Sequence, residues 1–197
     1  LAAGKSFYRT RETPPPEISA ARAVVADQKN SGELFFAAKP ADRWPLASLT
    51  KLMGAGVVLR NLNLDDAVTL APRDFALGGE EGGLAPGEEY RVRDLLRVAL
   101  SASSNEAAEA LANFFGRAGF IGQMNTIAAS WGMTDTHFDD PAGLSASNQS
   151  TIIDLQRLIL RISEEYPDIL KITRQKSWTV RDLASGKSKT LKSTNLF

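Results

Sequence analysis

Hydrophobic and polar positions alternate near both ends of the chain, whereas longer apolar and helical patterns occupy its middle. The segments 18–27 and 33–38 are rich in β-branched, aromatic and small apolar residues, and a short polar turn segment separates them. This arrangement predicts a β-hairpin. Near the other end, the segments 176–180 and 188–194 alternate again on either side of a turn, which predicts a second pair of strands.

Three segments in the middle of the chain predict helices. Residues 48–60 contain no acidic residue and are apolar on nearly every side, as expected of a helix buried in the core. Gly54 and Gly56 lower the helix propensity of that segment, which indicates that a neighbour packs close to the backbone there. Residues 94–115 predict two helices separated by a turn at the small polar residues 101–104, and a capping box opens a helix over 151–165.

This order of elements predicts the fold class α/β (α+β). Strands from both chain ends are expected to share one antiparallel sheet, packed against the buried helix and flanked by the other helices. Residues 1–17 are polar and end in three prolines, which is typical of an extended leader. We therefore expect a leader over 1–17 and one domain over 18–197.

Composition narrows the functional classes. The chain has 197 residues and is 43% hydrophobic, which is enough for one substantial core. Its 23 basic and 23 acidic residues balance, so no net field favours nucleic acid or an anionic membrane surface. No apolar run reaches the length of a membrane span. With no cysteine and one histidine, neither a disulfide framework nor a typical zinc site is expected, and we predict no cofactor.

Ser48 and Lys51 form the first candidate catalytic pair. They lie three residues apart at the start of the predicted buried helix, so both side chains face the same way within one turn. An apolar setting disfavours the lysine cation, and the neutral amine can then accept the serine proton. The helix N-terminus also offers N–H groups to a developing oxyanion. A serine cap followed by a solvated lysine is the alternative for an isolated Ser-x-x-Lys pattern.

A second motif, with Ser103 and Asn105, lies at the predicted break between two helices. Together with Ser48 and Lys51 it resembles the low-molecular-mass penicillin-binding proteins, the D-alanyl-D-alanine carboxypeptidases and endopeptidases. The resemblance covers about residues 18–197 and rests on three ordered runs: Trp44–Met53, Leu100–Ala108 and Phe138–Ser145.

The resemblance implies a β-lactamase- or transpeptidase-like fold with a mostly helical subdomain. It implies that Ser48 is the acylated nucleophile and Lys51 the proton acceptor. Ser103 would relay a proton to the leaving D-alanine, and Asn105 would hydrogen-bond the substrate backbone. The implied partners are peptidoglycan stem peptides ending in D-Ala-D-Ala and β-lactam antibiotics as covalent inhibitors, which places the protein in the periplasm or another extracytoplasmic compartment. Membrane association would require a segment outside the given sequence.

The family's third motif, Lys-Thr/Ser-Gly on a strand, does not occur in the sequence. Lys189-Thr190-Leu191 lacks the glycine that lets a substrate approach the backbone, so we interpret it as unrelated. Residues 192–197 resemble the segment that the family places shortly before this motif. We therefore expect the motif and further strands to follow residue 197. Ser193-Thr194-Asn195 is a second Ser-x-Asn pattern, but its strand context argues against catalysis.

Several alternatives stay open. His137 could form a triad with Ser48 and a nearby Asp139 or Asp140, although its position before a Pro-Gly loop is typical of a structural histidine. The glycine-rich segment 78–83 lacks the Lys-Ser/Thr of a phosphate loop and predicts a flexible edge of the cleft.

The alternative functions are a β-lactamase, a catalytically silent binding protein and an endopeptidase. A β-lactamase needs an additional carboxylate to activate the deacylating water, and the run Phe138–Ser145 contains no glutamate. A catalytically silent protein that binds wall peptides or a partner protein would also fit the missing third motif. Within the peptidase function, the sequence does not separate a carboxypeptidase from an endopeptidase.

Overall fold

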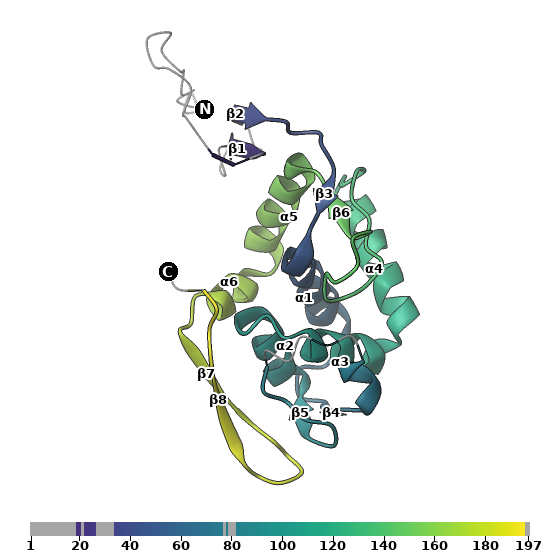
Figure 1. Ribbon diagram of the computed structural model, residues 1–197, viewed down its shortest axis with the longest axis vertical. Helices are drawn as coiled ribbons and strands as arrows, with labels where there is room; N and C mark the ends of the chain where they lie inside the picture. Colours follow the sequence, from purple (N-terminus) through teal and green to yellow (C-terminus); the bar gives the residue numbers. More distant parts are fainter. Residues whose placement is uncertain (1–18, 21, 27–33, 77, 79–81, 196–197) are drawn as a thin grey trace, which may run out of the picture.

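The structure is a computed structural model that describes residues 19–20, 22–26, 34–76, 78 and 82–195. Helices surround one central helix, and two pairs of strands lie near the two ends of the chain (Figure 1). The predicted leader 1–17 and the turn of the first hairpin lie outside the described residues. In the part of the chain that is described, no helix combines the length and the apolar character needed to cross a membrane.

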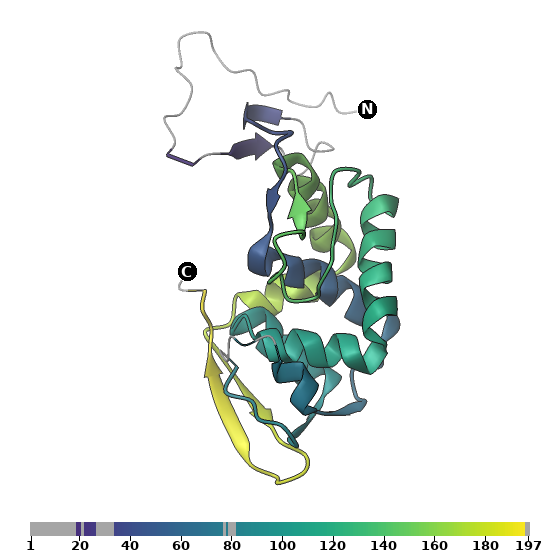
Figure 2. The same ribbon diagram turned by 45° about the vertical axis from the view of Figure 1, so that its right-hand side comes forward.

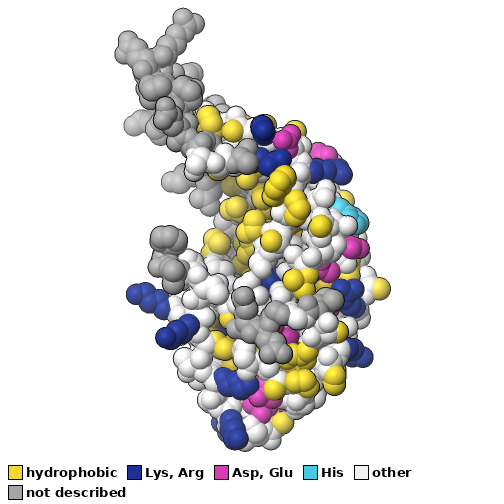
Figure 3. Space-filling model, in the orientation of Figure 1, with side chains coloured by type: hydrophobic (Ala, Val, Ile, Leu, Met, Phe, Trp, Pro, Cys, Tyr) yellow, Lys and Arg dark blue, Asp and Glu magenta, His cyan; other side chains and the backbone are white. Residues whose placement is uncertain are grey.

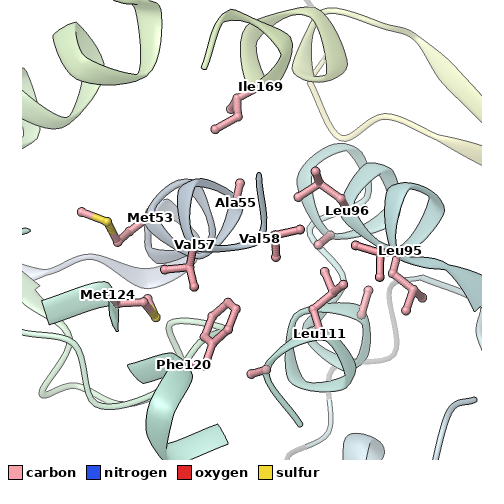
Figure 4. Packing of buried hydrophobic residues seen from close by; sticks show 14 of the residues in the cluster. Met53, Ala55, Val57, Val58, Leu95, Leu96, Leu111, Phe120, Met124 and Ile169 are labelled. Atoms are coloured by element: carbon pink, nitrogen blue, oxygen red, sulfur yellow. The ribbon is translucent and has the colours of Figure 1, made fainter. Parts of the chain in front are cut away.

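The central helix is α1, Thr50–Asn61, and a short 3-10 turn, Ala47–Leu49, leads into it. Most of its first two turns is buried, as the apolar pattern predicts. The predicted close neighbour of Gly54 is Phe120: a Cβ at this glycine would lie 3.5 Å from the ring. Met53, Val57 and Val58 of α1 belong to the buried hydrophobic cluster, and Figure 4 shows labelled side chains of other helices arranged around α1, which is therefore the centre of the core.

The surrounding helices confirm the predicted breaks and caps. Ser104 ends the turn after the second helix and accepts a hydrogen bond from the N–H of Ala107 at 3.0 Å, so it caps the third helix. Thr151 caps the fifth helix by accepting from Asp154 N at 3.2 Å. The helices are α2 Val92–Ser101, α3 Asn105–Phe115, α4 Arg117–Ser130, α5 Ile152–Glu165 and α6 Pro167–Thr173, with a 3-10 turn at Pro72–Phe75.

Helix α4 was not predicted, because glycines interrupt its sequence pattern. Gly119 and Gly122 reduce its intrinsic propensity. Phe120 and Met124 are nonetheless almost completely buried against α1 (Figure 4), and this packing stabilises the helix. Tertiary contacts therefore outweigh local propensity here.

The strands form antiparallel pairs. β1 (Ala23–Ala26) pairs with β2 (Leu34–Ala38), and β7 (Ser177–Arg181) pairs with β8 (Ser188–Lys192), which confirms both predicted hairpins. The shorter pairs are β3 (Trp44–Pro45) with β6 (Gln149–Ser150) and β4 (Ala67–Thr69) with β5 (Glu89–Arg91).

The predicted fold class is confirmed, but the prediction of one sheet shared by the two chain ends is corrected. Among the described residues, the β1–β2 and β7–β8 pairs are separate two-stranded sheets. β1 contacts α5, whereas β7 and β8 contact α2. Figure 2 shows the two pairs at opposite ends of the molecule. Each hairpin contacts a different helix, and within the described strands no ladder of hydrogen bonds joins the two pairs.

Candidate active site

Ser48 and Lys51 contact each other at the entrance to α1. Ser48 lies on the short turn that precedes the helix, and its side chain is at the surface. Lys51 is 4% exposed, and its Nζ lies 3.0 Å from Ser48 Oγ. The lysine is therefore not the solvated side chain of a capped surface helix. A hydroxyl open to solvent beside a buried amine is the geometry of a nucleophile with an adjacent base.

Two further acceptors hold the Lys51 amine. Its Nζ donates to the side-chain oxygen of Asn105 at 2.9 Å and to the backbone carbonyl of Ala142 at 2.9 Å. Both oxygens can only accept hydrogen bonds, so each binds an N–H of Lys51 whether the amine is neutral or protonated. A neutral amine has two N–H groups, and when these face Asn105 and Ala142 the lone pair is directed to Ser48. The arrangement thus orients the base as well as burying it.

Ser103 completes the hydroxyl–amine cluster. Its Oγ donates to Ser48 Oγ at 2.9 Å and lies 3.5 Å from Lys51 Nζ. It sits between α2 and α3 with a φ of 57°, a left-handed conformation that costs a non-glycine residue about 1 kcal/mol or more. This backbone conformation turns the side chain toward α1. The turn that the sequence predicts at 101–104 therefore brings the second motif to the first.

Asn105 opens α3 and faces two partners. Its oxygen accepts from Lys51, and its amide group donates to the carbonyl of Gly78 at 3.4 Å. The structure thus places Asn105 beside the base, whereas its predicted contact with the substrate backbone stays a prediction. Gly78 belongs to the glycine-rich segment, whose residues 79–81 lie outside the described residues.

The loop that carries the Ala142 carbonyl was not predicted as part of the site. The family resemblance rests in part on the run Phe138–Ser145, but it assigned no role to Ala142 or Gly143. Gly143 adopts a φ of 88° and passes directly against the residue before the nucleophile: a Cβ there would overlap the carbonyl group of Ala47. A glycine in a Pro-x-Gly turn signals such a conformation, but only the fold shows what it contacts.

A hollow of about 340 Å³ adjoins the cluster. It is large enough for a short peptide segment. Side chains of α1 and α2 line it, and Thr194, near the end of the chain, forms part of the wall. Thr194 is held there by its backbone N–H, which donates to the carbonyl of Ser101 at 2.8 Å. The second Ser-x-Asn pattern thus borders the hollow through its threonine.

A second, more apolar hollow of about 390 Å³ lies between β1, α1 and α5. Figure 3 shows hydrophobic side chains gathered on this face of the molecule. Its lining consists of aliphatic residues and Gln156, so it offers no reactive group beyond the site described above.

Lys189 has a structural role rather than a catalytic one. Its Nζ lies 2.6 Å from Glu88 Oε1 and 2.6 Å from the carbonyl of Gly83, which ties β8 to the loop before β5. Burial is the largest single influence on the pKa of Glu88 and raises it, but the hydrogen bonds from Lys189, the Ala85 N–H and Tyr90, together with the charge of Lys189, lower the pKa overall. This ion pair agrees with the interpretation of Lys189-Thr190-Leu191 as unrelated to the third motif.

The triad alternative finds no support in the described residues. His137 is exposed, and its backbone pairs with Gln149 in an isolated bridge. Asp139 accepts from the hydroxyl of Ser145 at 3.0 Å, and Asp140 accepts from backbone N–H groups of its own loop. Both carboxylates are thus engaged within the loop.

Solved structures share this fold over most of the chain. A D-alanyl-D-alanine carboxypeptidase from Mycobacterium tuberculosis superposes with a TM-score of 0.86 at 28% identity, covering 96% of this chain and 72% of that one. A mutant of the Streptomyces K15 DD-transpeptidase gives a TM-score of 0.81 at 31% identity, covering 92% and 76%. The fold is therefore that of the penicillin-binding DD-peptidases.

The family follows from the sequence comparison. The family model described as D-alanyl-D-alanine carboxypeptidase, peptidase family S11, matches residues 9–196, so the chain belongs to this family. The D-alanyl-D-alanine endopeptidases of Pseudomonas aeruginosa and Escherichia coli are 36% and 35% identical to it, over 79% and 86% of the chain. The chain spans about half of their lengths, 53% and 54%. The resemblance inferred from the three sequence runs is confirmed.

Proposed function

We propose that the protein is a serine-type DD-peptidase that cleaves D-alanyl-D-alanine bonds of peptidoglycan stem peptides through an acyl-enzyme on Ser48. The observation that carries the proposal is the placement of Lys51, a buried amine 3.0 Å from an exposed serine hydroxyl and held by two obligate acceptors. Family membership supports the choice of substrate.

The proposed reaction begins with Ser48. Its Oγ attacks the carbonyl carbon of the penultimate D-alanine, and its proton passes to the neutral amine of Lys51. The C–N bond then breaks, and the proton held by Lys51 passes through the hydroxyl of Ser103 to the leaving amine. Water attacks the carbonyl carbon of the resulting ester and gives a proton to the Lys51 amine. The bond from this carbon to Ser48 Oγ then breaks, and the same proton passes from Lys51 back to Oγ. No cofactor or metal enters these steps.

β-Lactam antibiotics would acylate the same serine. In a β-lactamase a carboxylate activates water to release the acyl group. Here Asp140 is engaged with its own loop, and Asp139 accepts from Ser145. We therefore infer slow deacylation, so that penicillin acts as a covalent inhibitor rather than as a substrate.

Carboxypeptidase activity is the first candidate, since the matching family model carries that description. Endopeptidase activity on cross-links is the second, and it is favoured by the names of the relatives from Pseudomonas aeruginosa and Escherichia coli. The acyl half of the two substrates is the same, and only the leaving amine differs. The same Ser48 chemistry serves both.

The substrate also implies a location. Peptidoglycan lies outside the cytoplasmic membrane, so we propose a periplasmic or other extracytoplasmic site of action. The domain division at residues 17 and 18 and the membrane association through a further segment stay predictions.

A fluorescent penicillin tests the nucleophile. The protein and its Ser48→Ala variant are incubated with the reagent and examined by denaturing gel and intact mass. We expect one stable adduct per chain, lost in the variant. The absence of label from the full-length protein would contradict the peptidase proposal and favour a silent binding protein. Rapid loss of label with turnover of the reagent would instead indicate a β-lactamase.

Purified wall fragments then separate the two peptidase activities. Monomeric pentapeptide fragments report release of free D-alanine, and cross-linked dimers report conversion to monomers. Ser48→Ala is the control for both reactions. Activity on dimers alone would identify an endopeptidase, and activity on monomers alone a carboxypeptidase.

A further inference from the structure

We propose that Asp140 and Asn148 are positioning residues for the base: they shape the loop 140–145 so that the carbonyl of Ala142 meets Lys51 and directs its lone pair to Ser48. This inference rests on the proposed function for its catalytic meaning. Asp140 and Asn148 are almost completely buried, and no role for them follows from the peptidase chemistry alone.

The Asp140 carboxylate organises the loop from within. Oδ1 accepts from the backbone N–H groups of Ala142 at 2.7 Å and Gly143 at 2.5 Å, and from a third at 3.3 Å. Oδ2 accepts from the N–H of Ser145 at 2.5 Å. Four N–H groups that converge on one carboxylate curl the backbone around it, so the carbonyl of Ala142 points outward, to Lys51 Nζ at 2.9 Å.

Asn148 joins this loop to α1. Its side-chain oxygen accepts from the N–H groups of Asp139 at 2.7 Å and Asp140 at 3.1 Å. Its amide group donates to the carbonyl of Asp140 at 2.9 Å and to the hydroxyl of Thr50 at 3.1 Å. Thr50 lies between the nucleophile and the base in the sequence. These hydrogen bonds fix the position of the loop relative to the first turn of α1.

The contact at Gly143 also fixes the position of the loop relative to the nucleophile. Its backbone lies so close to the Ala47 carbonyl that a side chain would not fit between them. The loop therefore contacts the chain on both sides of Ser48, at Ala47 in the 3-10 turn and at Lys51 in α1. A small shift of the loop would move an acceptor away from the amine, and misplacement by about 1 Å can cost about 100-fold in rate.

Asp140→Asn tests this role, with Asp139→Asn as a matched control. The asparagine keeps the shape of the side chain, but its NH₂ group would face backbone N–H groups that the carboxylate accepts. Asp139 is exposed, and in the described part of the chain its carboxylate accepts a hydrogen bond from the Ser145 hydroxyl. The acylation rate constant at saturating benzylpenicillin, the dissociation constant of the complex before acylation and the thermal midpoint are measured for each protein.

We expect Asp140→Asn to lower the acylation rate constant by about 10- to 100-fold at a temperature where it is folded, with a dissociation constant within about 3-fold of the wild type. Asp139→Asn should match the wild type. A variant that loses only thermal stability, or only affinity, would overturn the proposal. If Asp140→Asn does not fold, Asn148→Asp takes its place, since it keeps the two accepted bonds and removes the two donated ones.

A crystal structure of the same variant separates this proposal from the proposed function. If penicillin does not acylate the wild type, the proposed peptidase function is wrong. The distance from the Ala142 carbonyl to Lys51 Nζ in the variant still tests the positioning role. An increase of about 1 Å or more would support it, and an unchanged contact would overturn it.

Discussion

The side-chain oxygen of Asn105 lies 2.9 Å from Nζ of Lys51, although the two residues are 54 positions apart in the sequence. The same Nζ contacts Ser48, so the asparagine and the nucleophile share one amine. An uncharged acceptor can orient this amine without deciding its protonation state. The identity of the residue at position 105 should therefore control the pH range in which Lys51 can act as a base.

Asn105→Asp should move the acid limb of the pH profile of acylation to higher pH. A carboxylate in place of the amide stabilises the ammonium form of Lys51, so a higher pH is needed to produce the neutral amine. Penicillin acylation rates measured between pH 5 and pH 10 would show the shift. Asn105→Ala provides the comparison, because it removes the acceptor without adding charge. An unshifted profile in Asn105→Asp would contradict the role of Lys51 as the base.

Lys51→Arg should reduce the acylation rate constant by about 100-fold or more. The guanidinium keeps the positive charge but does not lose its proton in proteins, so it cannot accept the proton of Ser48. Stopped-flow fluorescence with a labelled penicillin measures this rate. Arg60→Lys near the end of α1 is the matched control, because it exchanges the same two residue types on one helix without touching the cluster. Wild-type rates in Lys51→Arg would exclude proton acceptance by the lysine.

Gly143→Ala should destabilise the protein by about 2 kcal/mol or more. The glycine has a φ of 88°, and the added Cβ would overlap the carbonyl group of Ala47. Urea unfolding followed by circular dichroism measures the change. Gly186→Ala, with a φ of 73° but with only one side-chain atom 3.5 Å from the added Cβ, is the control for backbone strain alone. Equal losses in both variants would show that strain, not the contact with Ala47, dominates.

Phe120→Ala should lower the free energy of unfolding by about 3 to 5 kcal/mol, since the ring fills the space between α4 and α1. Phe114→Ala is the matched control, because Phe114 is 42% exposed and its loss leaves no enclosed cavity. Chemical denaturation of both variants gives the comparison. A smaller loss for Phe120→Ala than for Phe114→Ala would contradict the assigned core.

Asp182 should make stability depend on pH in the acid range. Its carboxylate accepts backbone N–H groups, first from Glu89 and then within its own turn, and these hold its pKa at about 2, below the ordinary value of 3.8. A lowered pKa means that the stabilisation is complete above about pH 4 and is lost as the pH falls toward 2.

Unfolding free energies between pH 6 and pH 2 test this expectation. Asp182→Asn should be less stable than the wild type at pH 6, and the difference should narrow as the pH falls below 4. Asp168→Asn, at an exposed ion pair on α6, is the control. A difference between Asp182→Asn and wild type that does not change with pH would contradict the assigned pKa.

The sequence predicted those elements of the fold that are set by residues close together in the chain. The buried helix after Ser48, the turn at Ser103 and the cap at Thr151 follow from residues close together in the chain, and all three are confirmed. Helix α4 and the separation of the two hairpins were missed. Their formation depends on contacts with distant elements, which outweigh or add to the local preferences.

The sequence by itself determined the family and the residue types of the chemistry, because Ser48, Lys51, Ser103 and Asn105 stand in short, ordered motifs. Only the tertiary structure decided how the base is held. The second obligate acceptor of Lys51, beside Asn105, is the backbone carbonyl of Ala142, a group that every residue type possesses and that no sequence pattern can single out. Its direction depends on the fold of a loop around a buried carboxylate, and that fold exists only once distant segments have packed against α1.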